Sequence, residues 1–201
     1  WNPSNQRYWN GSILTGTWQS NGLLVKLDKN GNLVWQQMLG SPSEVAGFYS
    51  VALYDNHVYV MGTSKPSGAG YVIVAKYTIN GVLVWQKQLD STATNFATVT
   101  NSGVIKFDGS GNIFVMTDSC IIKLDSSGNV VWGKQLFTTS QYCRDFVIGP
   151  TGSIYISALA TVSGSYSRQH VIKLDTTGAI LWQKYASLAT TAGTQDLPNS
   201  I

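Results

Sequence analysis

One eleven-residue phrase occurs four times in this chain of 201 residues. Its first copy, residues 25–35, reads Val-Lys-Leu-Asp-Lys-Asn-Gly-Asn-Leu-Val-Trp. The copies recur about every 50 residues, a period typical of propeller blades, in which each unit is a small sheet that must bury its faces against its neighbours. The repeated columns are the lysines Lys26, Lys76, Lys123 and Lys173, the glycines Gly31, Gly81, Gly128 and Gly178, and the tryptophans Trp35, Trp85, Trp132 and Trp182. The repeat therefore predicts an all-β propeller of four-stranded antiparallel blades.

The composition agrees with a β structure. Charged residues make up only 11% of the chain, and Glu44 is its sole glutamate, whereas long helices are normally rich in Glu, Lys and Ala. Strand formers such as Val, Ile, Tyr and Trp alternate with turns rich in Gly, Asn and Asp. Few charges and many hydroxyl groups also suit a secreted, cell-surface or virion protein.

We expect one propeller domain over residues 1–201, in which each unit contributes strands A to D in chain order. The expected units are 1–40, 41–90, 91–137 and 138–186, with a possible closing strand in 187–201. The expected strands of the last three units are 48–54, 57–62, 71–77 and 82–89, then 104–107, 112–117, 120–124 and 130–136, then 145–148, 153–158, 170–174 and 179–185.

The two ends of the sequence leave the blade number open. The first unit has a strand-B phrase at 12–16 but no clear strand A, and residues 195–201 could supply that strand. Such an exchange would close a ring of four blades, the low end of the usual range. In the alternative, these are four consecutive blades of a larger propeller whose remainder is missing or comes from another chain. Because the chain lacks a starting Met and ends abruptly, we expect a fragment or a processed product.

The charge pattern argues against nucleic acid as a partner. The net charge is +3, and seven of the thirteen basic residues fall in two repeat columns. Lysines spread around a ring are expected at solvated outer-strand positions rather than in one base-reading patch. No apolar run approaches the ~20 residues that a membrane helix needs, so we expect no membrane insertion.

The phrase Lys123-Leu124-Asp125-Ser126-Ser127-Gly128-Asn129, together with Gly111-Asn112-Ile113-Phe114-Val115, resembles the bacterial β-propeller repeats called SBBP-type. The resemblance covers most of the chain and implies the fold rather than an activity. Similar repeats also occur in structural proteins of bacteriophage virions, which makes a tail or fibre component one interpretation.

The repeat is also similar to the tryptophan-docking phrase of quinoprotein propellers. In that phrase Gly follows Asp by four residues, whereas Gly31 follows Asp28 by three, so every copy here is one residue short. The adjacent cysteines and the acidic calcium and base residues of the quinone enzymes are missing too. We therefore expect no cofactor, and a quinone-dependent dehydrogenase fragment is only a remote alternative.

Few residues combine into a chemical site. The repeat tryptophans are expected to pack between neighbouring blades, since a periodic column suits a repeat interface. The loop that begins at Asp28 lacks the glycine and the bidentate glutamate of a calcium-binding loop, so a turn is favoured and no metal site is expected. His57 and His170 are expected at the surface or at strand ends, with no catalytic partner. Cys120 and Cys143 are expected as two separate thiols, with a disulfide as the alternative.

The binding candidates lie on the face where the repeat breaks down. The A–B and C–D turns stay short, whereas the B–C and D–A connections at the opposite rim vary in length. Variable loops on a rigid scaffold are where binding residues tend to lie, and aromatic residues beside Arg can stack on sugars. The candidate residues are Trp18, Tyr142, Arg144, Tyr166 and Arg168.

The sequence thus predicts a non-catalytic structural or interaction module of an extracellular, cell-surface or virion assembly, whose partners are other protein chains. The alternative is a glycan-binding receptor or adhesin module that uses the variable-loop face.

Overall fold

The fold was examined in a computed structural model, which describes residues 8–9, 14–15, 22–39, 44–66, 71–89, 102–137, 141–162 and 166–186. All regular structure in these ranges is β-strand, which confirms the predicted all-β class. The strands are β1 (Tyr8–Trp9), β2 (Leu14–Thr15), β3 (Gly22–Leu27), β4 (Leu33–Leu39), β5 (Glu44–Tyr54), β6 (His57–Pro66), β7 (Tyr71–Thr78), β8 (Leu83–Leu89), β9 (Gly103–Phe107), β10 (Ile113–Thr117), β11 (Cys120–Leu124), β12 (Val130–Gln135), β13 (Gln141–Ile148), β14 (Ile154–Val162), β15 (Tyr166–Leu174) and β16 (Ile180–Ala186).

Three of the sheets are four-stranded antiparallel meanders, in the orders β5-β6-β7-β8, β9-β10-β11-β12 and β13-β14-β15-β16. These are the propeller blades that the repeat predicted, with every expected strand present at shifted ends. The first unit contributes two separate two-stranded sheets, β1-β2 and β3-β4. The expectation that this unit has no clear strand A needs correction, because β1 pairs with β2 at the strand-A position.

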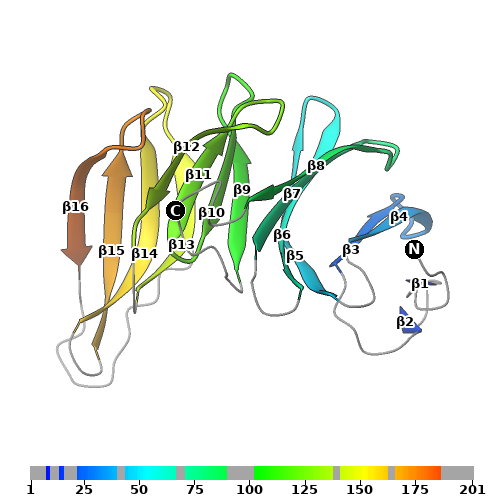
Figure 1. The fold of residues 1–201 in the computed structure, drawn as a ribbon, viewed down its shortest axis with the longest axis horizontal. Helices are drawn as coiled ribbons and strands as arrows, with labels where there is room; N and C mark the ends of the chain where they lie inside the picture. Colours follow the sequence, from blue (N-terminus) through cyan, green and yellow to red (C-terminus); the bar gives the residue numbers. More distant parts are fainter. Residues whose placement is uncertain are drawn as a thin grey trace.

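The sheets stand side by side along an arc, with β3–β4 at one end and β13–β16 at the other (Figure 1). Substantial contacts between sheets join neighbours along the chain, such as β5 with β9 and β9 with β13. The described sheets therefore form an open arch (Figure 1) rather than a closed ring of four blades. The possible closing strand in residues 187–201 lies outside the described residues.

The apolar core lies between the sheets. Strand alternation sends successive side chains of β6 to opposite faces. Val58 and Val60 join a cluster that includes Leu24 of the first unit, whereas Tyr59 and Met61 join a cluster with the third sheet. A further cluster, which includes Phe146, joins the third and fourth sheets. Each blade is thus stabilised mainly by its two neighbours, as in other repeat proteins.

Three of the four C–D turns share one local design, whereas the turn of the second unit has Thr78 in place of the Asp, and Thr78 Oγ1 accepts from the Val82 N–H at 3.1 Å. Asp125 Oδ1 accepts backbone hydrogen bonds from Ser127 at 2.9 Å and Asn129 at 2.8 Å, and Gly128 takes a φ of 82°. A left-handed residue ends such a turn, and Gly adopts this conformation without steric cost. The turns that begin at Asp28 and Asp175 have the same arrangement.

Tryptophan and glycine interlock between consecutive units. A β-carbon placed on Gly81 would lie 2.7 Å from Trp35 of the preceding unit, and one on Gly178 would lie 3.0 Å from Trp132. Gly128 is covered in the same way by Trp85. Two constraints therefore require glycine at these three positions: the left-handed backbone and the indole that covers it. This contact is called the Trp–Gly lock below.

The indole N–H adds a directional bond to two of the locks. Trp35 Nε1 donates to the Ile79 carbonyl at 3.1 Å, and Trp132 Nε1 donates to the Thr176 carbonyl at 3.2 Å. Each acceptor lies two residues before the covered glycine. In the first lock Lys26 Nζ donates to the same carbonyl at 2.9 Å. A buried Trp usually needs such a partner for its single polar atom.

Trp132→Ala and Trp182→Ala form a matched pair that measures the lock. Trp132 covers the next sheet, whereas no following sheet covers Trp182 among the described residues. We expect Trp132→Ala to lower the free energy of unfolding by about 3 kcal/mol and Trp182→Ala by about 1–2 kcal/mol. Chemical denaturation at low protein concentration would measure both, and equal losses would contradict the lock.

Candidate functional site

Among the described side chains, the structure separates Tyr142 from Arg168, two of the residues predicted on the variable-loop rim. Strands β13 and β15 begin earlier than expected, so Tyr142, Arg144, Tyr166 and Arg168 all lie in strands. Tyr142 pairs with Leu159, and Arg168 pairs with the next residue, Ala160. Because successive residues of a strand face opposite sides, exposed Tyr142 and exposed Arg168 lie on opposite faces of the sheet.

Two of those candidates need separate mention. Arg144 is the extra residue of a β-bulge between Cys143 and Asp145, and its side chain is exposed. Trp18 lies outside the described residues, as does the side chain of Tyr166. Binding at this rim remains a prediction.

A polar groove lies at the opposite rim, where the short turns gather. Its cavity of about 610 Å³ is bounded by the β9–β10 turn, the β13–β14 turn and the β15–β16 turn. Its polar lining consists of Asp108, Ser110, Asn112, Lys123, Thr151 and Thr176. At residues 108–112 the sequence predicts only a short A–B turn. The sequence held one indication of the groove, because a second short turn, 149–152, carries hydroxyl and backbone groups to the same edge.

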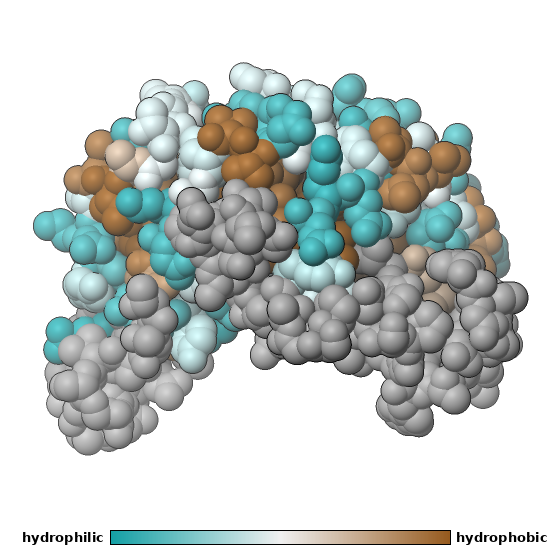
Figure 2. Space-filling model, viewed as in Figure 1, coloured by the Kyte–Doolittle hydropathy of each residue, from teal (hydrophilic) through white to brown (hydrophobic). Residues whose placement is uncertain are grey.

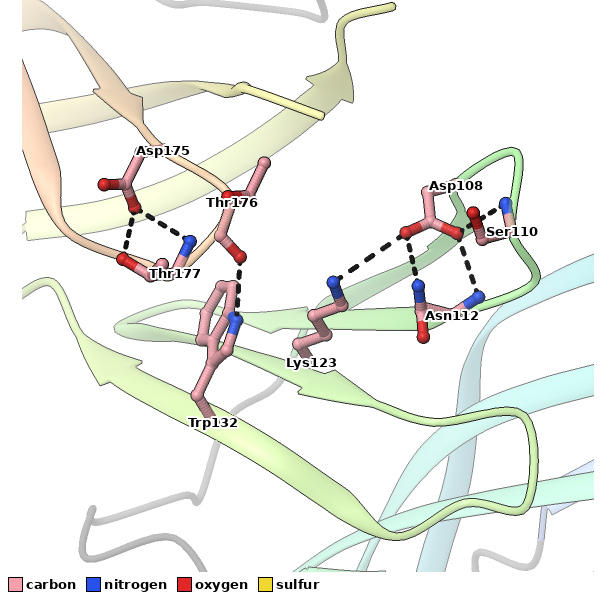
Figure 3. A network of polar contacts seen from close by, with 8 residues as sticks. All are labelled: Asp108, Ser110, Asn112, Lys123, Trp132, Asp175, Thr176 and Thr177. Atoms are coloured by element: carbon pink, nitrogen blue, oxygen red, sulfur yellow. Dashed lines mark hydrogen bonds and ion pairs between the residues drawn. The ribbon is translucent and has the colours of Figure 1, made fainter. Parts of the chain in front are cut away.

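Asp108 organises one wall of this groove (Figure 3). Its carboxylate accepts hydrogen bonds from the Ser110 backbone at 2.9 Å and from Asn112 Nδ2 at 2.7 Å, and Lys123 Nζ lies 3.9 Å away. Burial alone would raise the pKa of Asp108, but the hydrogen bonds from Asn112 and Ser110 and the charge of Lys123 outweigh it and lower the pKa. The carboxylate is therefore ionised, and the hydrogen bonds that it accepts hold the turn in place.

The lysine column has a different environment from the solvated one that the sequence predicted. Lys76 Nζ lies 5.2 Å from the centre of the Tyr59 ring, and the Tyr59 ring meets Trp85 edge to face at 6.0 Å. The third and fourth units repeat this arrangement of lysine, strand-B aromatic and tryptophan. The correction has a physical reason: these lysines lie on inner strand C, where a cation is held by the ring face.

The residue before each repeat tryptophan is an exposed apolar bulge. In strand D of the second unit, Trp85 pairs with Lys76 and Leu83 pairs with Tyr77, which leaves Val84 as the extra residue. The same register shift occurs in all four units. The four bulge residues and their exposed fractions are Val34 52%, Val84 48%, Val131 54% and Leu181 54%. The sequence signal was present, because each Trp follows two apolar residues.

His170 was expected at the surface or at a strand end, and the structure corrects this. Since β15 begins at Tyr166, His170 lies well inside the strand and is only 1% exposed. Its ring stacks on Tyr185 with 4.1 Å between centroids, and among the described residues neither ring nitrogen makes a hydrogen bond of ordinary geometry. Burial lowers the pKa of His170 below its ordinary value and outweighs the opposing effect of the nearby Gln183 side chain. His57, by contrast, lies at the start of β6, with Nδ1 2.6 Å from the Asp55 carbonyl oxygen.

Both cysteines are buried free thiols. Burial raises the pKa of Cys120 to about 11, while the Thr117 hydroxyl lies 3.0 Å from its sulfur. Burial also raises the pKa of Cys143, and the nearby groups Cys120 and Asp118 raise it further. Thiols held in this protonated form react slowly.

Two features are absent from the described residues. These ranges contain no group of three or more His, Cys, Asp or Glu side chains that could hold a metal ion. The same ranges contain no helix with the length and apolar character that crossing a membrane requires.

No family model matches this chain, and no curated protein matches it. Similar solved structures include a protein of unknown function from Bacteroides caccae, 14% identical over 80% of this chain and 73% of that chain, with a TM-score of 0.41. A glycoside hydrolase is 16% identical over 73% of this chain and 38% of its own, with a TM-score of 0.41. A quinoprotein alcohol dehydrogenase-like protein from Bacteroides thetaiotaomicron is 13% identical over 89% of this chain and 57% of its own, with a TM-score of 0.40.

The buried His170 gives a pH prediction. Its folded-state pKa is below the ordinary value of 6.5, so the unfolded chain binds the proton more readily. Stability should therefore fall as the pH decreases below 6.5, toward the folded-state pKa. We expect His170→Phe to reduce this loss, measured as the free energy of unfolding between neutral and mildly acidic pH. His57 is present in both proteins, and identical pH profiles would contradict the assignment.

Proposed function

We propose that this chain is a structural and interaction module, without catalytic activity, in an extracellular, cell-surface or virion assembly. The observation that carries the proposal is the set of four exposed bulge residues. Apolar side chains at the same position of every unit present a periodic surface, and Figure 2 shows separate apolar patches along the upper part of the arch. Exposed apolar groups arranged in this way favour contact with another protein chain.

The geometry of strand D supports an interface rather than random exposure. Strand D lies at the end of the strand order of its sheet, and among the described residues no strand pairs with its other edge, which leaves that edge open to other chains. A bulge interrupts that edge, which discourages continuous strand addition, and it turns one apolar side chain outward. A partner chain would then recognise this edge through the packing of side chains rather than through backbone hydrogen bonds. The resemblance to SBBP-type repeats and the low charge content support the same assignment to a surface or virion assembly.

Site-specific photo-cross-linking in the native assembly would test this proposal. A photoreactive amino acid at Val84, Val131 or Leu181 should form an adduct with the same protein partner in a fixed ratio. The same group at Ser126, an exposed turn position, is the control. We expect Val131→Lys to abolish co-purification of that partner. Adducts no stronger than at Ser126 would overturn the proposal.

A second candidate function, glycan binding, is favoured by the polar groove. Ser110, Thr151 and Thr176, which carry hydroxyl groups, line the cavity together with Asp108. Sugars present many hydroxyl groups, which such hydrogen-bonding side chains can recognise. This candidate uses the short-turn rim, not the variable-loop rim that the sequence pointed to.

Two equivalent turns supply a matched test of glycan binding. Ser110 and Ser127 occupy the same position of the turns that begin at Asp108 and Asp125, but only Ser110 lines the groove. On a glycan array we expect Ser110→Tyr to abolish binding, because the larger ring fills the cavity, and Ser127→Tyr to retain it. Equal binding by both variants, or none by the unaltered chain, would rule the groove out.

A further inference from the structure

The Trp–Gly lock occurs three times among the described residues, and there the first glycine and the last tryptophan of the repeat have no partner in a lock. Gly31 has a φ of 86°, close to the φ values of the three locked glycines, but no atom of the described residues lies within 4 Å of the position that its β-carbon would take. Trp182 is 39% exposed, more than the three locked tryptophans, and no following sheet covers it in the described part of the chain. The first sheet thus offers an uncovered glycine turn, and the last sheet offers an uncovered indole.

Both halves already have the shape that they need. Trp182 meets the Tyr155 ring edge to face at 6.3 Å, and Lys173 Nζ lies 5.0 Å from the centre of that ring, as in the two preceding units. At the other end, Asp28 holds its turn through hydrogen bonds to Asn30 and Asn32, both at 2.8 Å. Both surfaces are therefore ordered before association, which lowers the entropic cost of binding.

The two halves lie at opposite ends of the arch (Figure 1), so one chain cannot bring its own described halves together in this shape. A contact between two different patches is heterologous and forms either a closed ring or an open filament. Each chain carries four repeat units, and two chains would bring eight units together, within the usual range of four to eight blades. A second copy of this chain is therefore the occupant that fits both ends at once.

We propose that two copies of this chain associate head to tail through the Trp–Gly lock, with Trp182 of each copy covering Gly31 of the other. In the internal locks, the carbonyl acceptor lies two residues before the glycine. The corresponding acceptor for the Trp182 indole N–H is the Lys29 carbonyl of the second copy. Both locks form in the dimer, so the ring closes with two-fold symmetry.

This interface is distinct from the bulge residues and does not depend on the proposed function. The lock lies between the faces of two sheets, whereas the bulge residues lie on the free edges of strand D. The two surfaces can therefore be tested separately, and Leu181 beside Trp182 offers a close control.

Sedimentation velocity of the 201-residue chain over a wide concentration range would test the proposal. We expect a dimer in the unaltered chain and a monomer for Trp182→Ala, with the fold of the variant checked by thermal melting. Leu181→Ala, which changes an exposed neighbour outside the lock, should leave the dimer intact. A chain that stays monomeric, or a dimer that is lost with Leu181→Ala but kept with Trp182→Ala, would overturn the proposal.

Complementation makes the test specific for the pairing. Gly31→Ala should also give a monomer, because its methyl group would occupy the space of the incoming indole, and Asn30→Ala is its control. A mixture of Trp182→Ala and Gly31→Ala chains keeps one intact lock, between Trp182 of one and Gly31 of the other. We expect this mixture to recover a one-to-one complex that neither variant forms alone. A mixture that remains monomeric would contradict the head-to-tail pairing.

Discussion

The contact between an indole and a left-handed glycine turn is the constraint on which the rest of this structure depends. Each sheet has only a few short strands and cannot bury both faces by itself. The tryptophan of one unit covers the glycine of the next, and in two of the three locks its N–H also binds a turn carbonyl. Relative position of neighbouring blades is thereby fixed by shape and by a directional bond, not by apolar contact alone.

The lock also explains features that surround it. For Trp85 to face the next sheet while Leu83 keeps its pairing, one residue has to leave the ladder, and that residue is Val84. The bulge then exposes an apolar side chain at the free edge of strand D. The strand-B aromatic ring meets the indole edge to face, and the lysine cation lies over that aromatic ring. Packing between blades and exposure at the outer edge are thus two consequences of one local geometry.

Surfaces that could carry function follow from this arrangement in three places. The bulge residues face outward from every blade, the polar groove lies at the short-turn rim, and the uncovered halves of the lock lie at the two ends of the arch. None of these uses the aromatic and basic residues of the variable-loop rim as a group. Extension of β13 and β15 places Tyr142 and Arg168 on opposite faces, and strand alternation then keeps them apart.

Much of the fold could be predicted from the sequence because its determinants are local and repeated. The spacing of Asp125, Gly128 and Trp132 encodes a turn, a left-handed residue and a packing anchor within eight residues. The first and fourth units repeat it, and the second unit keeps the Gly and the Trp with Thr78 in place of the Asp. Strand ends were harder to predict, because β13 and β15 begin in polar sequence, where pairing and not composition decides the length of a strand. Because the sequence pattern placed the start of β15 at residue 170, it put His170 at a strand end and did not predict its burial.

The sequence by itself determined the blade, its turns and the identity of the residues that join one blade to the next, since these follow from spacing along the chain. Only the tertiary structure decided which glycine each tryptophan covers, which residue the bulge turns outward, and which side chains share a groove. These depend on register and on contacts between units about 50 residues apart, which a repeat period implies but does not specify. The open arch, with Gly31 uncovered at one end and Trp182 at the other, belongs to that second group.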